Sequence, residues 1–202
     1  MPHTMLSTYV FDCSVCHTRC DGKSKAVYIF EKDTVFSEHF ENMIIDKINL
    51  SQKYEAAKCN EAGYPDVAVY NKNGQLSNYV EVKVQQRTFM TVKRILPESG
   101  LLPSETVALN LSDLQRYFTI FDVIKTPISI VWVLLNRPCI TTENAPLFFY
   151  QRIEKLREIY LENKDKRRFR RKSGEGDIVE GEHKGVTVNY HFSLKELLEW
   201  KA

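Results

Sequence analysis

The chain has 202 residues, of which 43% are hydrophobic and 11% aromatic. This composition predicts one packed globular domain with a small elaboration and excludes a disordered chain. The formal net charge of +2 is too small to indicate a nucleic-acid partner by itself. No apolar run is long enough to cross a membrane, and the first residues, MPHTMLSTYV, lack the pattern of a signal peptide. We therefore expect a cytoplasmic protein with reduced cysteines.

A small β element is predicted over residues 1–33, where the segments STYVFDC and KAVYIFEKD flank a cysteine-rich loop. A Cys-x₂-Cys pair between two strands is typical of the first half of a zinc ribbon, and the second half is missing here. A bound metal, with structural Zn²⁺ ahead of an iron–sulfur cluster, and free cysteines in a reducing compartment are the interpretations of this loop. The candidate zinc ligands are Cys13, Cys16, His17 and Cys20.

The second predicted part, residues 34–202, begins with a helix over residues 34–50, where apolar side chains recur at helical spacing. Asp33 or Thr34 is suited to cap the start of this helix. The segment KYEAAKC, within residues 51–63, is expected to form a strand, with a helix as the alternative.

A β-hairpin is predicted over residues 63–86. β-Branched and aromatic residues lie on both sides of Asn73-Gly74, a pair that favours a two-residue type I′ turn. With that turn, Val67 lies opposite Val80. Because side chains alternate along a strand, an apolar face and a polar face result. The apolar face holds Val67, Val69, Val80, Val82 and Val84, and the polar face holds Asp66, Glu81, Lys83 and Gln85.

On the polar face, Asp66 and Glu81 are expected to lie directly opposite one another. Opposed residues have Cβ atoms roughly 4.5–5.5 Å apart, and like charges so placed are destabilising. Mg²⁺ or Mn²⁺ between the two carboxylates would remove the conflict, since hard cations prefer oxygen ligands. Lys83 is suited to position an attacking water or to stabilise charge on a phosphate. The alternative is an ordinary half-exposed strand without a chemical role.

The remaining elements follow the hairpin. Residues 87–106 contain two prolines and a glycine and are expected to form an excursion. A helix is predicted from Ser112 to the Thr126-Pro127 step, and the apolar run at residues 128–136 predicts a strand buried on both faces. A helix over about residues 147–163, a strand at GVTVNYHF and a last helix, opened by a capping box of Ser193 and Glu196, complete the prediction.

A basic run separates two of these elements. Seven of the nine residues in KDKRRFRRK, residues 164–172, are basic. Clustered cations neutralise phosphates, so we predict a mobile loop that orders on DNA, with a solvated loop as the alternative. Phe169 is suited to stack on a base or to anchor the loop. The predicted DNA-binding residues are Lys166, Arg167, Arg168, Arg170 and Arg171.

Pro65-Asp66, followed by Glu81-Val82-Lys83 on the next strand, resembles the motif of the PD-(D/E)xK nuclease superfamily. The resemblance covers about residues 34–135. It implies an α/β fold with a restriction-endonuclease-like core, in which helices flank a central mixed β-sheet. It also implies site roles for the matched residues. Asp66 and Glu81 would be metal ligands helped by the Val82 carbonyl, Lys83 would position the water, and Gln85 would support the site.

The resemblance extends to the first predicted helix, where the family often carries one more acidic residue. Glu41 follows Phe40 there, a step that resembles the Mrr-like branch, and is the implied additional metal ligand. Glu38 is the second choice. An exposed carboxylate without a role is the alternative for both residues.

The implied function is a metal-dependent endonuclease, a hydrolase that cleaves DNA phosphodiester bonds. Restriction or defence is favoured among the roles that the resemblance implies, because no separate recognition module is evident in the sequence. A homodimer that cuts both strands is also implied. Two alternatives remain: a nuclease-fold protein that binds DNA without cutting it, and a zinc-stabilised interaction module of a larger complex.

Overall fold

The computed structural model describes residues 30–85, 88–135, 140, 146–170, 178–179, 182–183 and 188–200. The predicted zinc ligands Cys13, Cys16, His17 and Cys20 lie outside these residues, as does Arg171. The helices and strands are, in chain order, α1 (Phe30–Leu50), β1 (Tyr54–Lys58), β2 (Val67–Asn71), β3 (Leu76–Gln85), α2 (Val92–Ile95), η2 (Pro97–Ser99), β4 (Thr106–Asn110), α3 (Leu111–Ile124), β5 (Ile128–Leu134), β6 (Leu147–Arg152), α4 (Ile153–Asn163), η3 (Lys164–Arg167), β7 (Arg168–Arg170), β8 (Ile178–Val179), β9 (Glu182–His183), β10 (Val188–Ser193), η5 (Leu194–Glu196) and β11 (Leu198–Glu199).

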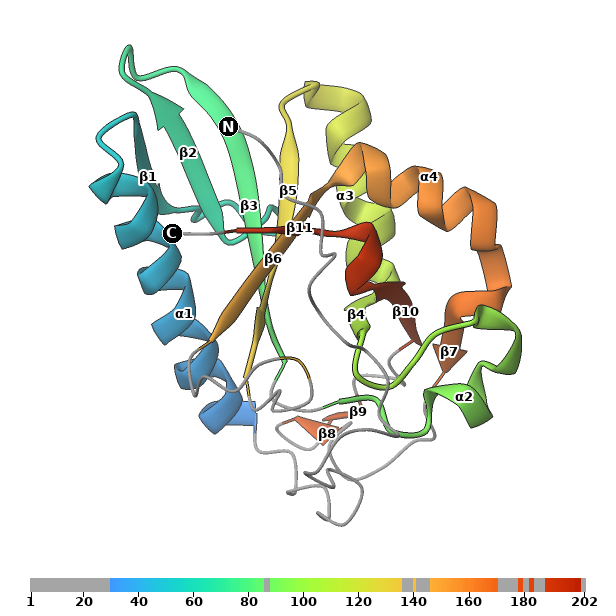
Figure 1. The fold of residues 1–202 in the computed structure, drawn as a ribbon. Coiled ribbons are helices and arrows are strands. Elements are labelled where there is room, and N and C mark those ends of the chain that lie inside the picture. The colour runs from blue at the N-terminus through green and yellow to red at the C-terminus, as the bar shows by residue number, and fades with distance from the viewer. Residues whose placement is uncertain are drawn as a thin grey trace.

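A six-stranded sheet with the strand order β1-β2-β3-β5-β6-β11 forms the centre of the fold (Figure 1). β3 and β5 are parallel, and the other neighbouring strands are antiparallel. α1 covers one face of this sheet, and α3 and α4 lie over the other (Figure 1). The predicted α/β class, with a central mixed sheet flanked by helices, is therefore confirmed. The expected order of helix, acidic hairpin, helix and buried strand corresponds to α1, β1–β3, α3 and β5.

Two smaller sheets accompany the central one. β4, β10 and β7 form an antiparallel three-stranded sheet, and β8 pairs with β9. The expected excursion, residues 87–106, holds α2 and η2, and β4 begins at its last residue, Thr106. The β4 residues Thr106, Val107, Ala108 and Leu109 are all buried.

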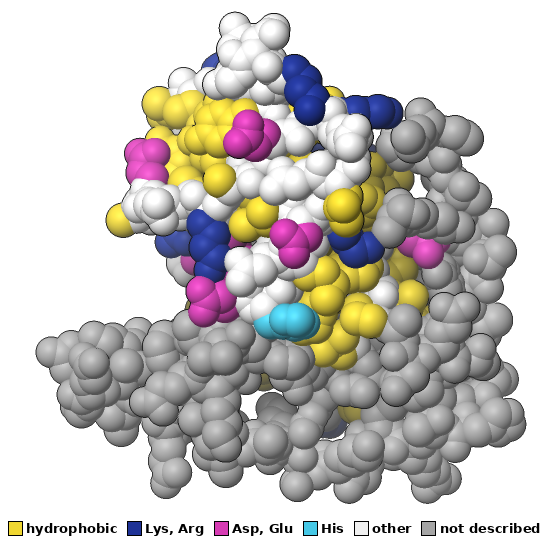
Figure 2. Space-filling model, turned by 90° about the vertical axis from the view of Figure 1, so that its left-hand side faces the viewer, with side chains coloured by type: hydrophobic (Ala, Val, Ile, Leu, Met, Phe, Trp, Pro, Cys, Tyr) yellow, Lys and Arg dark blue, Asp and Glu magenta, His cyan; other side chains and the backbone are white. Residues whose placement is uncertain are grey.

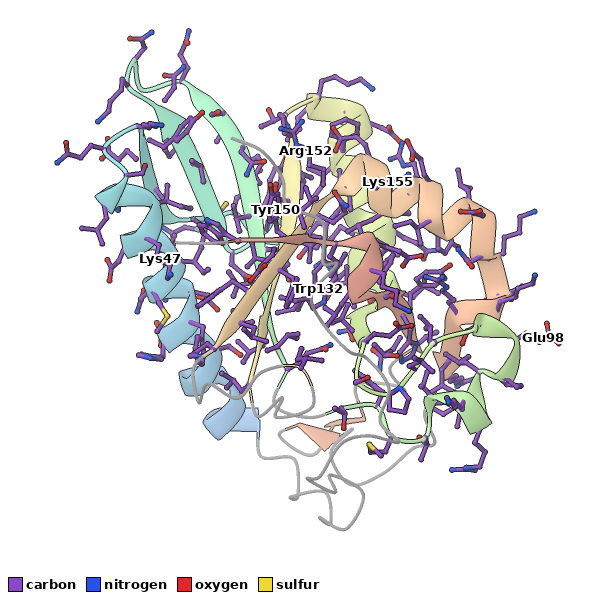
Figure 3. All side chains as sticks on the ribbon, viewed as in Figure 1. Lys47, Glu98, Trp132, Tyr150, Arg152 and Lys155 are labelled. Atoms are coloured by element: carbon purple, nitrogen blue, oxygen red, sulfur yellow. The ribbon has the colours of Figure 1, made fainter. Side chains whose placement is uncertain are left out.

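Alternation along β3 and β5 assigns side chains to two separate cores. Even-numbered valines of β3, with Val131 and Val133 of β5, pack against Phe40 and Ile44 of α1. The opposite face of β5 contributes Ile130, Trp132 and Leu134 to a larger core that includes residues of α3 and α4. Trp132 is fully buried and lies in the middle of the structure (Figure 3). Burial on both faces explains why this strand reads as a continuous apolar run.

The hairpin has the predicted pairing but a different turn. Val67 pairs with Val80 and Val69 with Asn78, as predicted. The loop is nevertheless not a type I′ turn, because Gly74 has a positive φ of 73° while Asn73 does not. Hydrogen bonds from Gly74 N to Asn71 O and from Asn71 N to Gln75 O enclose a three-residue loop. The register shift between Val69 and Tyr70 offsets the extra loop residue, which restores the predicted pairing.

Two predicted helices have different bounds in the structure. α1 begins at Phe30, so residues 30–33, predicted as the end of a strand, are helical and the proposed boundary at residue 33 falls within this helix. The helix predicted over residues 147–163 is a strand, β6, followed by the shorter helix α4. Arg152 and Lys155 mark the passage from β6 to α4 (Figure 3). The aromatic residues Phe148, Phe149 and Tyr150 favour a strand, and β6 satisfies its backbone by pairing with β5.

The C-terminal prediction was right about the cap and wrong about the helix. Ser193 and Glu196 form the predicted capping box, with reciprocal side-chain to backbone hydrogen bonds. The cap opens a single 3₁₀ turn, η5, and the chain then continues as β11, which pairs with β6. The pairing of β11 with β6 at the edge of the sheet therefore prevents the turn at η5 from continuing as a helix. In the described part of the chain, no helix is long and apolar enough to span a membrane.

Candidate active site

The polar face of β3 lies on the same side of the central sheet as α3. Glu81, Lys83 and Gln85 alternate with Val80, Val82 and Val84, whose side chains point toward α1. Asp66 directly precedes β2, and its carboxylate accepts a hydrogen bond of 2.8 Å from Val82 N. The hairpin therefore brings Asp66 next to Glu81, as the predicted register requires.

Both carboxyl groups are withdrawn from water. The Glu81 side chain is 3% exposed, and Asp66 is half-buried. Burial is the main cause that raises the pKa of Glu81 to about 6, and the charge of Asp66 raises it further against the opposing effect of Lys83. Burial also raises the pKa of Asp66, more than the Val82 N–H and Lys83 lower it. The pair is thus electrostatically strained when both members are ionised.

Lys83 is the cation of this site. Its Nζ atom lies 2.5 Å from Glu81 Oε1 and 3.6 Å from Asp113 Oδ2. Burial lowers the pKa of Lys83, but the neighbouring carboxylates, with Glu81 first among them, raise it by more, so the net pKa is above its ordinary value. Lys83 is therefore a cation at neutral pH.

Helix α3 supplies three residues that the sequence analysis did not assign to the site. Asp113 contacts Lys83, and Arg116 Nη2 lies 2.9 Å from Asp113 Oδ1. Tyr117 is 1% exposed, and burial, followed by the charge of Glu81, raises its pKa well above the ordinary value. The spacing i, i+3, i+4 would have shown that the three share one side of a helix, but not that this side faces β3.

Gln85 has a structural contact at the end of the polar face. Its Nε2 donates to Ala108 O of β4 at 3.1 Å, while its Oε1 is buried without a hydrogen-bond partner among the described residues. Trp132 Nε1 donates to the same carbonyl at 3.0 Å. Gln85 thus ties β3 to the small sheet, and its predicted support of the reaction stays a prediction, as does a ligand role for the Val82 carbonyl.

The predicted acidic residues of α1 are paired with a lysine of β1. Lys58 Nζ lies 2.5 Å from Glu38 Oε1 and 3.6 Å from Glu41 Oε2. The Glu38 side chain is 54% exposed, whereas that of Glu41 is 20% exposed and its charge contributes to the raised pKa of Asp66. Glu41 is therefore the nearer of the two to the carboxylate pair, and its ligand role stays a prediction.

The donor set fits a hard divalent cation. Glu81 Oε2 is buried and has no hydrogen-bond partner among the described residues, and the second carboxylate, Asp66, is near enough for its charge to raise the pKa of Glu81. Mg²⁺ characteristically takes one or two protein carboxylates and keeps several waters. Over the residues that the structure describes, no group of three or more His, Cys, Asp and Glu surrounds one point. The residues therefore fit an ion held by two carboxylates and water.

The basic run is more ordered than predicted. Its first seven residues form η3 and β7, and β7 pairs with β10. Arg167 is buried, and its Nη1 binds both carboxylate oxygens of Glu196 at 2.7 and 2.9 Å, so it is not part of an exposed basic surface. Phe169 packs against the apolar cluster of α2, which corresponds to the anchoring alternative. Lys166, Arg168 and Arg170 are exposed.

The described residues also include a buried histidine and a half-buried cysteine. His191 is buried, its Nδ1 lies 3.2 Å from Arg167 O, and its ring meets Phe89 edge to face. Burial lowers the pKa of His191. Cys59 is a half-buried free thiol that packs against the larger core.

Comparisons with known proteins find a distant likeness among solved structures. No family model matches the chain, and no curated protein matches it. Among solved structures, the Holliday junction resolvase Hjc from the hyperthermophile Archaeoglobus fulgidus aligns over 78% of this chain and 84% of its own. The two are 9% identical, with a TM-score of 0.41. A likeness at this level carries no conclusion about what this chain does.

Proposed function

We propose that this chain is a metal-dependent endonuclease that hydrolyses phosphodiester bonds in DNA, built on a restriction-endonuclease-like core. The observation that carries the proposal is the Asp66–Glu81 carboxylate pair with Lys83 on the same polar face. A buried carboxylate oxygen without a partner beside a second carboxylate is costly unless a cation joins them.

Each residue of the pair has a distinct environment that supports its role. Asp66 is oriented by the Val82 N–H, which donates to Oδ2, and it interacts with the neighbouring Glu81 side chain. Glu81 presents Oε2 in the same place, while Oε1 holds Lys83. Asp66 and Glu81 would hold Mg²⁺ or Mn²⁺, and such an ion supplies a Lewis acid and lowers the pKa of a bound water.

Lys83 acts as a cation in this proposal. Hydrolysis joins a water oxygen to phosphorus and breaks one phosphorus–oxygen ester bond, which leaves a phosphate monoester and a free hydroxyl group. Negative charge on the phosphate increases along this path, and an ammonium group held at a fixed position stabilises it. Glu81 fixes that position, since it binds Nζ at 2.5 Å.

The DNA backbone is proposed to bind on the side of the molecule that carries β7. Lys166, Arg168 and Arg170 are exposed there, whereas Arg167 is committed to Glu196. The side that carries α1 is less suited to a polyanion, because its acidic and basic side chains are interspersed among hydrophobic ones (Figure 2). β7 lies far from α1, across the central sheet (Figure 1).

The decisive experiment is cleavage of supercoiled plasmid by the purified full chain, with Mg²⁺, Mn²⁺ or EDTA. Wild type is compared with Asp66→Asn, Glu81→Gln and Lys83→Ala. Nicking that requires both the metal and these three side chains is the expected result. Glu105 and Lys195 provide a matched control, because Glu105 is 3% exposed and its Oε2 lies 3.1 Å from Lys195 Nζ, outside the candidate site. Glu105→Gln and Lys195→Ala should cut like wild type once folded.

Two outcomes would overturn the proposal. Equal cleavage by wild type and Lys83→Ala would end the site assignment. No cleavage of plasmid, linear, branched or single-stranded DNA with either metal would favour a protein that binds DNA without cutting it. If DNA is not bound either, zinc content measured on the full chain tests the remaining alternative, an interaction module.

A further inference from the structure

The polar face of β3 is matched along its length by one later segment of the chain, β4 and α3. Gln85 binds Ala108 O, Lys83 contacts Asp113, and the charge of Glu81 acts on Tyr117. Asp113, Arg116 and Tyr117 occupy one side of α3 because they are three and four positions apart. The candidate site therefore has a second half, which comes from this helix.

Asp113 lies between two cations. Its Oδ2 is 3.6 Å from Lys83 Nζ, and its Oδ1 is 2.9 Å from Arg116 Nη2. The Asp113 side chain is 15% exposed, so these contacts are only partly screened by water. Two cations so close would repel one another, and the shared carboxylate both offsets that repulsion and sets where each one points.

Arg116 is the more accessible of the two cations. Its side chain is 43% exposed, and Nη2 also approaches the Tyr117 hydroxyl at 3.5 Å. Its stem lies against the turn before Pro65-Asp66, where a Cβ atom at Gly63 would sit 3.7 Å from Arg116 Cδ. A guanidinium has five donors, and only Nη2 has a hydrogen-bond partner among the described residues. The remaining donors suit phosphate oxygens.

We infer that Asp113 is a positioning residue and Arg116 a phosphate-binding residue, and that together they present Lys83 and Arg116 to one stretch of the DNA backbone. This inference rests on the proposed function. It deepens that function by assigning recognition of the sugar–phosphate backbone at the site itself to α3. A purely structural reading, in which Asp113 and Arg116 form an ordinary helix-surface pair, predicts no effect on DNA binding or turnover.

The test separates binding from turnover in the full chain. Affinity for a defined DNA duplex is measured by fluorescence anisotropy in EDTA over a series of salt concentrations, and kcat and KM are measured with Mg²⁺. Arg116→Ala should weaken binding about tenfold for any DNA sequence. It should also reduce the salt slope by about 1. Arg116→Lys, which keeps the charge, should recover part of the affinity.

Substitution of Asp113 should affect turnover more than DNA binding. Asp113→Asn and Asp113→Ala should lower kcat by about a hundredfold with a smaller change in KM, because a misplaced cation loses stabilisation of the transition state. Asp113→Glu should restore more activity than Asp113→Asn does. Circular dichroism and melting curves of each variant establish that the fold is intact.

The same helix offers a matched control. Asp122 of α3 binds Arg157 of α4 through two hydrogen bonds of 2.8 and 3.0 Å, outside the site. Asp122→Ala removes an Asp–Arg pair of the same chemistry and should leave DNA affinity and kcat at the wild-type values. If Asp113 and Asp122 variants behave alike, the positioning role is overturned.

The outcomes distinguish this inference from the function on which it rests. Wild-type cleavage that depends on Lys83 but not on Asp113 or Arg116 overturns the inference and leaves the nuclease standing. If the wild type cuts no DNA, the proposed function fails and the role of Asp113 fails with it. The anisotropy measurement then still decides on Arg116, since an unchanged salt slope in Arg116→Ala overturns phosphate binding.

Discussion

Two groups of charged residues in the described part of the chain differ in how their charges are balanced. The C-terminal pair, Arg167 and Glu196, has one charge of each sign, and Ser193 N adds a hydrogen bond of 2.9 Å to the same carboxylate. The hairpin cluster, Asp66, Glu81, Lys83, Asp113 and Arg116, has three carboxylates and two cations.

The difference indicates what each group is for. In the C-terminal pair, both Glu196 oxygens are bound, and only Arg167 Nε is buried without a partner among the described residues. Ser193 and Glu196 also form the capping box of η5, so the contacts of this pair serve the fold. In the hairpin cluster, burial and like charge raise the pKa of Asp66 and Glu81, and Glu81 Oε2 is left without a partner among the described residues. Perturbed and incompletely paired groups of this kind are typical of functional sites.

The largest effect expected is on cleavage. Asp66→Asn or Glu81→Gln should lower kcat at least about a thousandfold, equivalent to ~4 kcal/mol, because each removes a charged ligand for the metal. In metal-free buffer at neutral pH, the same variants should be more stable by up to about 1 kcal/mol, since like-charge repulsion is relieved. Turnover assays and urea denaturation in EDTA measure the two effects. If these variants lose stability as well as activity, the hairpin cluster is a structural ion network and not an active site.

Substitutions in the C-terminal pair should have the opposite effect, because they should lower stability and leave activity unchanged. Arg167→Met leaves Glu196 without its charge partner and should lower the free energy of unfolding by about 3 kcal/mol, measured by urea denaturation. Activity per folded molecule should not change. The double variant Arg167→Met/Glu196→Leu should recover part of the loss, because an apolar pair leaves no unpaired charge. If Arg167→Met is instead as stable as the wild type and binds DNA more weakly, Arg167 contacts DNA, as the sequence predicted.

Stability should depend on pH through Glu81. Its pKa is raised from 4.5 to about 6 in the folded chain, so the protonated carboxyl group favours the folded state. This contribution is fully present below pH 4.5 and is lost as the pH rises through about 6, at a total of about 2 kcal/mol in metal-free buffer. Denaturation at a series of pH values measures it. Glu81→Gln should flatten the dependence over this range, and Glu105→Gln should preserve it.

The last effect expected is stabilisation by the metal. At a tenfold excess over Kd, Mg²⁺ should raise the free energy of unfolding of the wild type by about 1.4 kcal/mol, because it binds the folded chain. Thermal melting with and without Mg²⁺ measures the change. Asp66→Asn and Glu81→Gln should lose the response, whereas Arg167→Met should keep it. Equal stabilisation of all variants would place the ion elsewhere in the molecule.

Much of the hairpin followed from the sequence. Alternation with a period of two determined that Glu81, Lys83 and Gln85 share one face and that the valines share the other. The pairing of Val67 with Val80 was also predictable, although the turn was not, because a bulge offset the longer loop. The continuous apolar run of β5 and the capping box of Ser193 and Glu196 are equally local signals, and both are present.

Other features depended on partners far away in the chain. Leu147–Arg152 became β6 because β5 offered a strand edge, and Arg167 became buried because Glu196, 29 residues later, met it. Asp113 entered the candidate site only when α3 packed across the polar face of β3. Local periodicity determines which face a side chain occupies, since that depends only on the backbone repeat. What the face meets depends on packing between distant segments, and only the tertiary structure decides it.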